Sequence, residues 1–191
     1  LGEDFISPEE IASARGLSYS NEQIAELHRA IPSRTTLEWL KSNDYMLVAG
    51  PPDEVSLFGI NKRFFHASGG GKWRTDSRAT FARDEKVSCR WYMLRKDIVP
   101  DSTNKTWSDQ TQLLESNETV PTAIELIWGL TCQKAIRNTY LMTGVFARTS
   151  SVDGDGNHVY VTRENEGGYY AEGWENSQVN HAIGISSTRE P

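Results

Sequence analysis

The chain of 191 residues contains 37% hydrophobic and 24% charged residues, and its formal net charge is −6. These values are typical of a water-soluble globular protein that builds a core without disulfides or metal ions, and they exclude collagen-like, disordered and coiled-coil chains. No apolar run approaches the ~18 residues that a membrane-spanning helix needs, so no membrane partner is expected. We predict a single domain, residues 1–191, with a helical segment over residues 1–43 and an α+β body over residues 44–191.

The first 43 residues predict three short helices. Ser7, Ser20 and Ser33 each stand where an N-cap is expected, and Pro8 takes a first helical position. Gln23 follows Ser20 at the spacing of a capping box.

A strand is predicted next, over residues 45–49, and it ends at a Gly-Pro-Pro sequence. The pattern in residues 55–85 is weak and suggests loops and short strands. Residues 87–95 read as a central strand, and a short helix is expected near residues 107–115.

The clearest helix in the sequence covers residues 122–137, where apolar side chains recur at nearly helical spacing after Pro121. Helices come first and strands last, without βαβ alternation, so the predicted fold class is α+β. We expect N-terminal short helices, a mixed or antiparallel sheet with the one long helix, and C-terminal antiparallel strands. Those strands are predicted over residues 144–149, 158–162, 168–174 and 182–188.

Charge is distributed unevenly along the chain. Residues 61–96 carry ten basic and three acidic side chains, whereas both flanking segments are acidic. Basic and aromatic residues are interleaved here, as in surfaces that stack bases and hold phosphates. A sheet with an aromatic inner face and a charged outer face, paired with the acidic flanks, gives the same pattern. The candidate polyanion-binding residues are Lys62, Arg63, Lys72, Arg74, Arg78 and Arg83.

One stretch resembles part of a calcium loop. Asp153, Asp155 and Asn157 place oxygen atoms at its first, third and fifth positions. His158 stands where such a loop needs glycine, and the residues after it alternate as a strand. A hairpin turn is therefore favoured over a cation site, and no metal or cofactor is predicted.

Catalytic patterns are weak. The four histidines are scattered without metal-ligand spacing, and no Gly-x-Ser-x-Gly sequence occurs. Cys89 and Cys132 lie in apolar stretches, so we expect buried thiols. An enzyme remains an alternative, in which His66 or His158 would stand beside a carboxylate.

Two longer stretches carry a family resemblance. They are residues 91–107 together with Gln110, and residues 148–156. Together they resemble a family of uncharacterised bacterial and phage-borne proteins. The resemblance covers most of the chain and implies a bacterial or phage origin, but it implies no activity.

The C-terminal part has a second resemblance. Gly173-Trp174 and the closing sequence from Ala182 to Arg189 are similar to the final strands of C-type-lectin-like domains of the formylglycine-generating-enzyme type. The chain departs from that pattern because it lacks paired cysteines. The resemblance implies a ligand surface of aromatic rings and amides; the alternative is that the rings are core residues on one face of a hairpin. The implied ligand-binding residues are Tyr169, Tyr170, Trp174, Asn176 and Asn180.

The function that we expect is a non-enzymatic binding or structural module whose partner is an unidentified protein or small ligand. The alternative is a nucleic-acid or other polyanion-binding protein that uses residues 61–96. No signal-peptide pattern is visible, so we expect a cytoplasmic or virion-associated protein. The sequence leaves the oligomeric state open.

Overall fold

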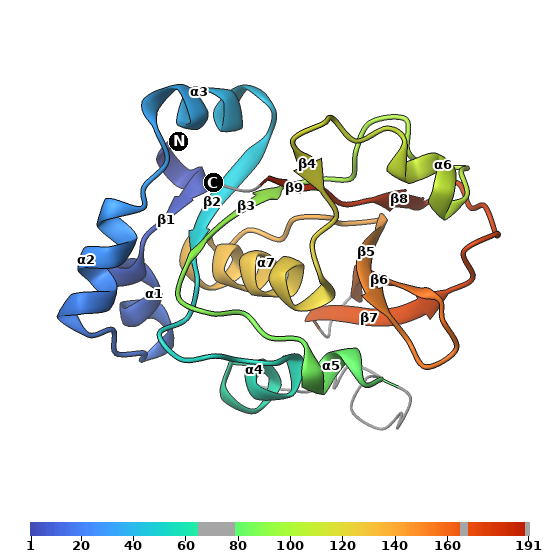
Figure 1. Ribbon diagram of the computed structural model, residues 1–191. Coiled ribbons are helices and arrows are strands. Elements are labelled where there is room, and N and C mark those ends of the chain that lie inside the picture. The colour runs from blue at the N-terminus through green and yellow to red at the C-terminus, as the bar shows by residue number, and fades with distance from the viewer. Residues whose placement is uncertain (65–78, 165–167, 190–191) are drawn as a thin grey trace.

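The computed structural model describes residues 1–64, 79–164 and 168–189. A long helix, α7 (Ala123–Arg137), lies at its centre, and Figure 1 shows a β-sheet on either side of this helix. Each sheet contains both parallel and antiparallel pairs. The predicted α+β class is confirmed, and so is the long helix expected over residues 122–137.

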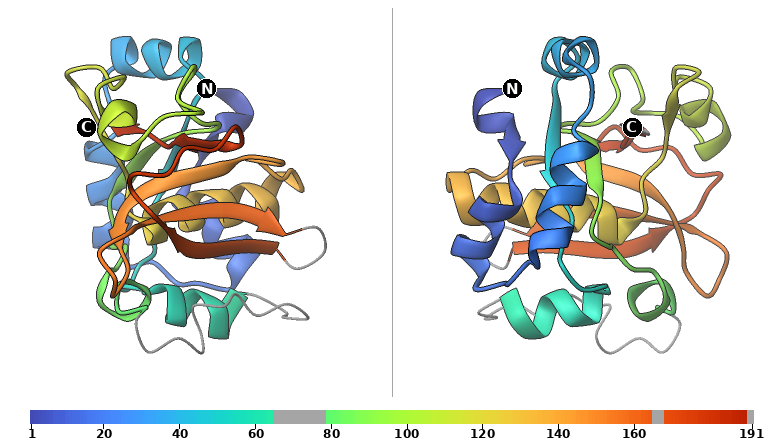
Figure 2. Two further views of the ribbon diagram at one scale, coloured as in Figure 1. Left: turned by 90° about the vertical axis from the view of Figure 1, so that its right-hand side faces the viewer. Right: turned by 60° about the vertical axis from the view of Figure 1, so that its left-hand side comes forward.

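Three short helices precede the first long strand, as the sequence predicts. Ser7 and Ser20 each complete a capping box, in which the Glu10 and Gln23 side chains accept the N–H of the capping residue. The Ser33 side chain caps the third helix. The right-hand view of Figure 2 brings this side of the molecule forward. The helices are α1 (Pro8–Arg15), α2 (Asn21–Arg29) and α3 (Arg34–Ser42).

One sheet has five strands in the order β1-β2-β3-β9-β4. The 3-10 turn η1 (Gly2–Asp4) leads into β1, which pairs in parallel with β2, and the other pairs are antiparallel. The helical segment 1–43 therefore supplies a strand that the sequence did not predict, because two residues are too few to show alternation. The strands are β1 (Phe5–Ile6), β2 (Tyr45–Ala49), β3 (Trp91–Arg95), β9 (Thr188–Arg189) and β4 (Glu118–Thr119).

A buried polar cluster fixes β9 between its neighbours. The Tyr45 hydroxyl donates to the Glu118 carboxylate and lies 2.6 Å from the Ser187 Oγ. Burial, together with the Glu118 carboxylate, raises the pKa of Tyr45, so this hydroxyl remains a neutral donor. The three side chains come from β2, β4 and the residue before β9, and they satisfy one another inside the protein.

The other sheet has four strands in the order β7-β6-β5-β8. The three longer strands form antiparallel pairs, but β8 runs parallel to β5. The prediction of uniformly antiparallel C-terminal strands is therefore wrong at β8, because the chain crosses from β7 to the far edge of the sheet before β8 begins. The strands are β5 (Phe146–Val152), β6 (His158–Glu164), β7 (Gly168–Trp174) and β8 (Ile183–Ile185).

The predicted strand over residues 182–188 is divided between the two sheets. Its first part is β8, and its last residue begins β9. Between them, the Ser186 N–H and Oγ both donate to the Arg148 carbonyl oxygen, at 3.0 and 2.7 Å. The C-terminal segment therefore joins one sheet to the other.

The segment after β2 is more helical than the sequence suggested. The loops and short strands expected over residues 55–85 are corrected to helices at both described ends of the segment. Leu57 and Ile60, three residues apart, turn the same face of a helix into the core. The helices are α4 (Leu57–Phe64) and α5 (Phe81–Asp84), and farther along the chain α6 (Trp107–Thr111) is shorter than expected.

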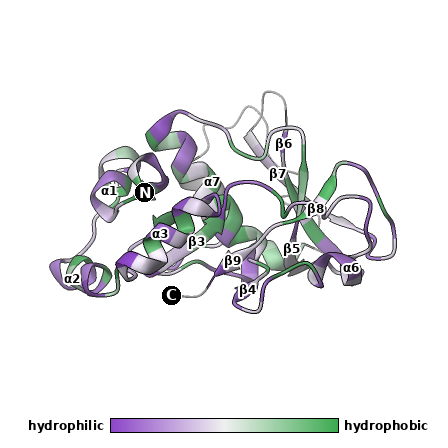
Figure 3. Cartoon of the chain, turned by 90° about the horizontal axis from the view of Figure 1, so that it is seen from above, coloured by the Kyte–Doolittle hydropathy of each residue, from purple (hydrophilic) through white to green (hydrophobic). Residues whose placement is uncertain are grey.

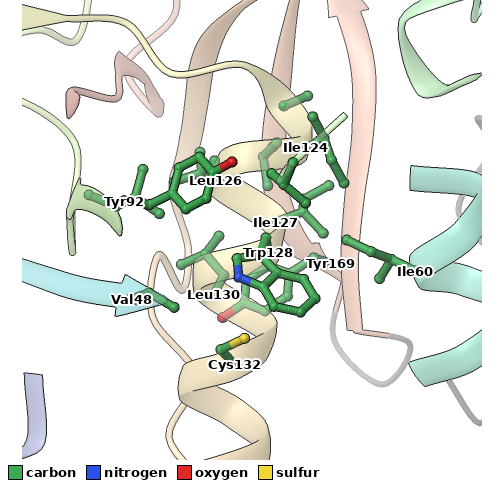
Figure 4. Packing of buried hydrophobic residues seen from close by; sticks show 14 of the residues in the cluster. Val48, Ile60, Tyr92, Ile124, Leu126, Ile127, Trp128, Leu130, Cys132 and Tyr169 are labelled. Carbon is green, nitrogen blue, oxygen red and sulfur yellow. The ribbon is translucent and has the colours of Figure 1, made fainter. Parts of the chain in front are cut away.

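The core surrounds α7. Figure 4 shows Trp128 among apolar side chains from both sheets, and its Nε1 donates to the Ala49 carbonyl oxygen at 2.9 Å. Gly129 allows a close approach to the five-stranded sheet, since a Cβ there would lie 2.4 Å from Leu94 Cδ1. Figure 3 shows hydrophobic residues gathered on β3 and on strands of the other sheet.

Two further expectations concern the thiols and the membrane. The expectation of buried thiols is confirmed for Cys132 but wrong for Cys89, which is partly exposed, and both are thiols outside any disulfide. Among the described residues, no helix combines the length and the apolar character required to cross a bilayer.

We expect Trp128→Ala to lower the free energy of unfolding by about 3–5 kcal/mol, because the change leaves a large cavity and removes the bond to Ala49. Urea denaturation followed by circular dichroism measures this loss. Ile31→Ala is the control, since Ile31 is 39% exposed and its truncation should cost less than about 0.5 kcal/mol. Equal losses in the two variants would contradict the central role of α7.

Candidate functional site

The four-stranded sheet has one face against α7 and one face turned away from it. Residues alternate between the two faces along each strand, so Val159, Val161 and Ala171 belong to the core around α7. Tyr160, at the position between the two valines, lies on the other face. In the left-hand view of Figure 2 the strands of this sheet lie in front of α7. The side chains on this outward face form the candidate site.

Four aromatic residues and one carboxylate form a cluster on this outer face, which we call the aromatic face. The Tyr160 ring is at its centre, 5.2 Å from the Phe146 ring and 6.3 Å from the Trp174 ring, both in edge-to-face geometry. The Tyr170 ring lies 6.1 Å from Tyr160. The two tyrosines are buried by their neighbours, whereas Phe146 and Trp174 are partly exposed. The aromatic face consists of Phe146, Tyr160, Tyr170, Trp174 and Glu172.

Glu172 links the two tyrosines. Both hydroxyls donate to its Oε2 atom, the bond from Tyr160 being 3.2 Å long. Burial raises the pKa of each tyrosine, and the neighbouring carboxylate raises it further. The hydroxyls therefore stay protonated at neutral pH, and the exposed carboxylate stays fixed beside the rings.

His158 and Trp174 extend this surface toward α6. They are opposite each other on β6 and β7, so their side chains share the outer face. The His158 imidazole stacks on the Trp107 ring at 3.4 Å between centroids. Among the described residues, neither Trp174 Nε1 nor His158 Nδ1 has a hydrogen-bond partner, although both atoms are buried. Two polar nitrogen atoms at neighbouring positions therefore lack the partner that buried polar groups ordinarily have.

Arg148 lies beneath the surface beside these residues. It is fully buried on β5, opposite Tyr160, and burial lowers its pKa. Its Nη1 donates to Gln110 Oε1 at 3.0 Å, and its Nη2 donates to the carbonyl oxygens of Glu175 and Gln178, each at 3.0 Å. The guanidinium group thus joins α6 and the segment after β7 to the sheet. No local sequence pattern indicates this role, since all these partners are distant in the chain.

Three of the five residues implied by the lectin-like resemblance lie on β7, but not on one face. Tyr170 and Trp174 are together on the aromatic face. Tyr169 lies on the opposite face, where its hydroxyl donates to the Leu141 carbonyl oxygen at 3.2 Å and accepts the Leu141 N–H at 3.1 Å. Alternation along a strand predicts this separation of Tyr169 from Tyr170.

The two asparagines lie in the segment after β7 and support its backbone. Asn176 Oδ1 accepts the His158 N–H at 2.9 Å, and its Nδ2 donates to the Gly156 carbonyl oxygen at 3.1 Å. Asn180 Oδ1 accepts the Ala182 N–H at 2.8 Å. Asn176 therefore positions His158 at the border of the aromatic face, and Asn180 shapes the approach to β8.

The predicted polyanion surface falls largely outside the described residues. Lys72, Arg74 and Arg78 belong to that part, while Lys62 and Arg63 fall in α4 without described side chains. Arg83 is exposed, and its guanidinium group lies 6.0 Å from the Phe58 ring. The polyanion hypothesis stays a prediction.

The stretch that resembles a calcium loop forms the turn between β5 and β6. Asp153 Oδ1 accepts the N–H groups of Asp155 and Asn157, both at 2.9 Å, so this oxygen atom fixes the turn. Within the described ranges, no three His, Cys, Asp or Glu side chains converge as a metal site would require.

The histidines proposed for an enzyme have different surroundings. His66 is outside the described residues. Burial, together with the nearby Arg148, lowers the pKa of His158 to about 4, against the opposing effect of Asp153. His158 is therefore neutral at physiological pH. A third histidine, His28, stands beside a carboxylate at the surface: its Nε2 lies 3.4 Å from Glu9 Oε1, and both side chains are more than half exposed.

Comparisons with known proteins add no relative: no protein-family model, no curated protein and no solved structure matches the chain.

The lowered pKa of His158 predicts a loss of stability in acid. Between pH 6.5 and about 4 the unfolded chain binds a proton at this residue that the folded protein does not bind, so the free energy of unfolding falls as the pH falls. Because the imidazole is only partly buried, we expect His158 to contribute on the order of 1 kcal/mol to this loss. Urea denaturation at several pH values should show a weaker pH dependence for His158→Gln. The exposed His181→Gln is the control, and equal pH profiles for the two variants would argue against the prediction.

Proposed function

We propose that this protein is a non-enzymatic binding module that holds a saccharide on the aromatic face. The observation that carries the proposal is the partly exposed Trp174, whose ring borders a cluster of three other aromatic rings and whose buried Nε1 has no partner among the described residues. A ligand that stacks on the ring and accepts a hydrogen bond from this nitrogen would satisfy both features.

The rings supply the apolar part of such a surface. Phe146 and Trp174 are both partly exposed, and the buried Tyr160 between them keeps their orientation fixed by two edge-to-face contacts. A surface that is ordered before binding loses little conformational entropy when the ligand arrives. Sugar rings present a flat C–H face that fits this kind of platform.

Polar groups beside the rings orient the ligand in this proposal. Indole Nε1 is a donor only, so Trp174 requires an acceptor such as a sugar hydroxyl oxygen. The exposed Glu172 carboxylate accepts hydrogen bonds, so it suits a hydroxyl hydrogen of the same ligand. Saccharides offer both kinds of partner from one hydroxyl-rich edge, and we favour them over purely apolar ligands for this reason.

A glycan array probed with the labelled protein tests the proposal, and titration calorimetry then measures affinity for a glycan that binds. We expect Trp174→Ala to weaken binding at least tenfold, because the stacking ring is lost. Trp174→Phe keeps a ring but removes the N–H donor, and should weaken binding by about 2- to 10-fold, as the loss of one hydrogen bond predicts.

Trp39→Phe is the matched control. Trp39 is also partly buried, but it lies on α3 and packs 5.2 Å from the Tyr45 ring, against the other sheet. This variant should bind as the wild type does. An array without any bound glycan, or binding that survives in Trp174→Ala, would refute the proposal. Retention of nucleic acid instead would favour the polyanion hypothesis.

A further inference from the structure

A hollow separate from the aromatic face lies in the five-stranded sheet. Strand β9 pairs with β3 only at Met93 and Leu94. On the side of these pairs toward the beginning of β3, a hollow of about 140 Å³ lies between β3 and the chain that follows β4. Its walls include Trp91 and Tyr92 from β3, Thr119 and Val120 on the other side, and Glu125 from the first turn of α7.

The charged groups around the hollow are two arginines and one glutamate. Arg90 Nη2 donates to Glu125 Oε1 at 2.6 Å, and the Arg90 guanidinium lies 4.6 Å from the Tyr92 ring centroid. The other oxygen, Glu125 Oε2, accepts the Thr122 N–H in the capping box of α7. Arg189 also lines the hollow, although its guanidinium group lies 4.3 Å from the Trp39 ring centroid, so two arginines and one carboxylate border this space.

Backbone groups add to this positive character. The Arg90 carbonyl oxygen points to the β2 side, where it accepts the Gly50 N–H, and the Arg95 N–H points to the β9 side, where it donates to the Ser187 carbonyl oxygen. The N–H groups of every second residue along an antiparallel strand point the same way. The Trp91 N–H, four residues before that of Arg95, therefore also points to the β9 side, where the hollow lies. The N-terminus of the 15-residue helix α7 has a positive partial charge as well.

We infer that this hollow binds an oxyanion group, a carboxylate or a phosphate, between the Arg90 guanidinium and the first turn of α7. A guanidinium group suits both, because its parallel N–H donors match their paired oxygen atoms. The volume is close to that of a cavity that holds benzene, so it accepts a group of about half a dozen non-hydrogen atoms. The carboxylate or phosphate group of the ligand lies in the hollow, while the rest of the ligand remains outside.

Nuclear magnetic resonance titrations of the ¹⁵N-labelled protein test the inference, with inorganic phosphate in one series and acetate in another, at constant ionic strength. We expect the Trp91 and Val120 amide signals to shift in a saturable manner. Arg90→Gln should weaken the binding at least tenfold. Glu125→Gln should strengthen it several-fold, since the competing carboxylate is removed while glutamine still supports the capping box.

The double variant Arg90→Gln with Glu125→Gln covers the case in which Arg90→Gln fails to fold because it leaves the partly buried Glu125 carboxylate without its ion pair. It removes both charges and should bind more weakly than Glu125→Gln alone. Arg34→Gln is the control, because Arg34 forms an exposed pair with Glu38 on α3. Saturable binding of phosphate alone would assign a phosphate ligand, and binding of acetate alone a carboxylate ligand.

No saturable shift with either anion, or equal shifts in the wild type and both Arg90 variants, would overturn the inference. Trp174→Ala should leave these titrations unchanged, because its ring lies on the other sheet. Because the two sites are separate, the anion-binding inference and the saccharide proposal are tested independently of each other.

Discussion

The packing of α7 between two sheets is the constraint on which the other contacts depend. Ten of the eleven residues from Ala123 to Gln133, all except Glu125, are buried. A helix in that position has no solvent face, so its few polar groups need partners inside the protein. Trp128 donates to a strand carbonyl, and Thr131 Oγ1 accepts a hydrogen bond from the Arg15 side chain. The surrounding strands and short helices pack against the buried side chains of α7, so these side chains determine where those elements lie.

The two candidate surfaces have different physical origins. The aromatic face arises because one side of the four-stranded sheet is not covered by α7, so its large rings cover one another and leave Phe146 and Trp174 partly exposed. The anion hollow arises because β9 is too short to fill the space between β3 and β4. The first favours apolar contact with directional hydrogen bonds, and the second favours charge.

The parts of the fold that the sequence predicted are those governed by local interactions. Ser7 and Ser20 specify helix starts through atoms within three residues, and α7 shows its apolar period over fifteen residues. Contacts between distant segments left no such signal: β8 is parallel to β5 only because of the path that the chain takes from β7. The site was predictable in part. Tyr170 and Trp174 are four residues apart on one strand, whereas Phe146, Tyr160 and the partners of Arg148 join them only in the folded protein.

The division of residues 183–189 between the two sheets has a consequence for biosynthesis. Strand β9 is inserted between β3 and β4, and β8 completes the edge beside β5, so neither sheet can close until these residues have left the ribosome. Until then β3 and β4 have no strand between them, and the Tyr45 hydroxyl and Glu118 lack Ser187. Folding into the final form therefore depends on contacts of long sequence separation, which form slowly.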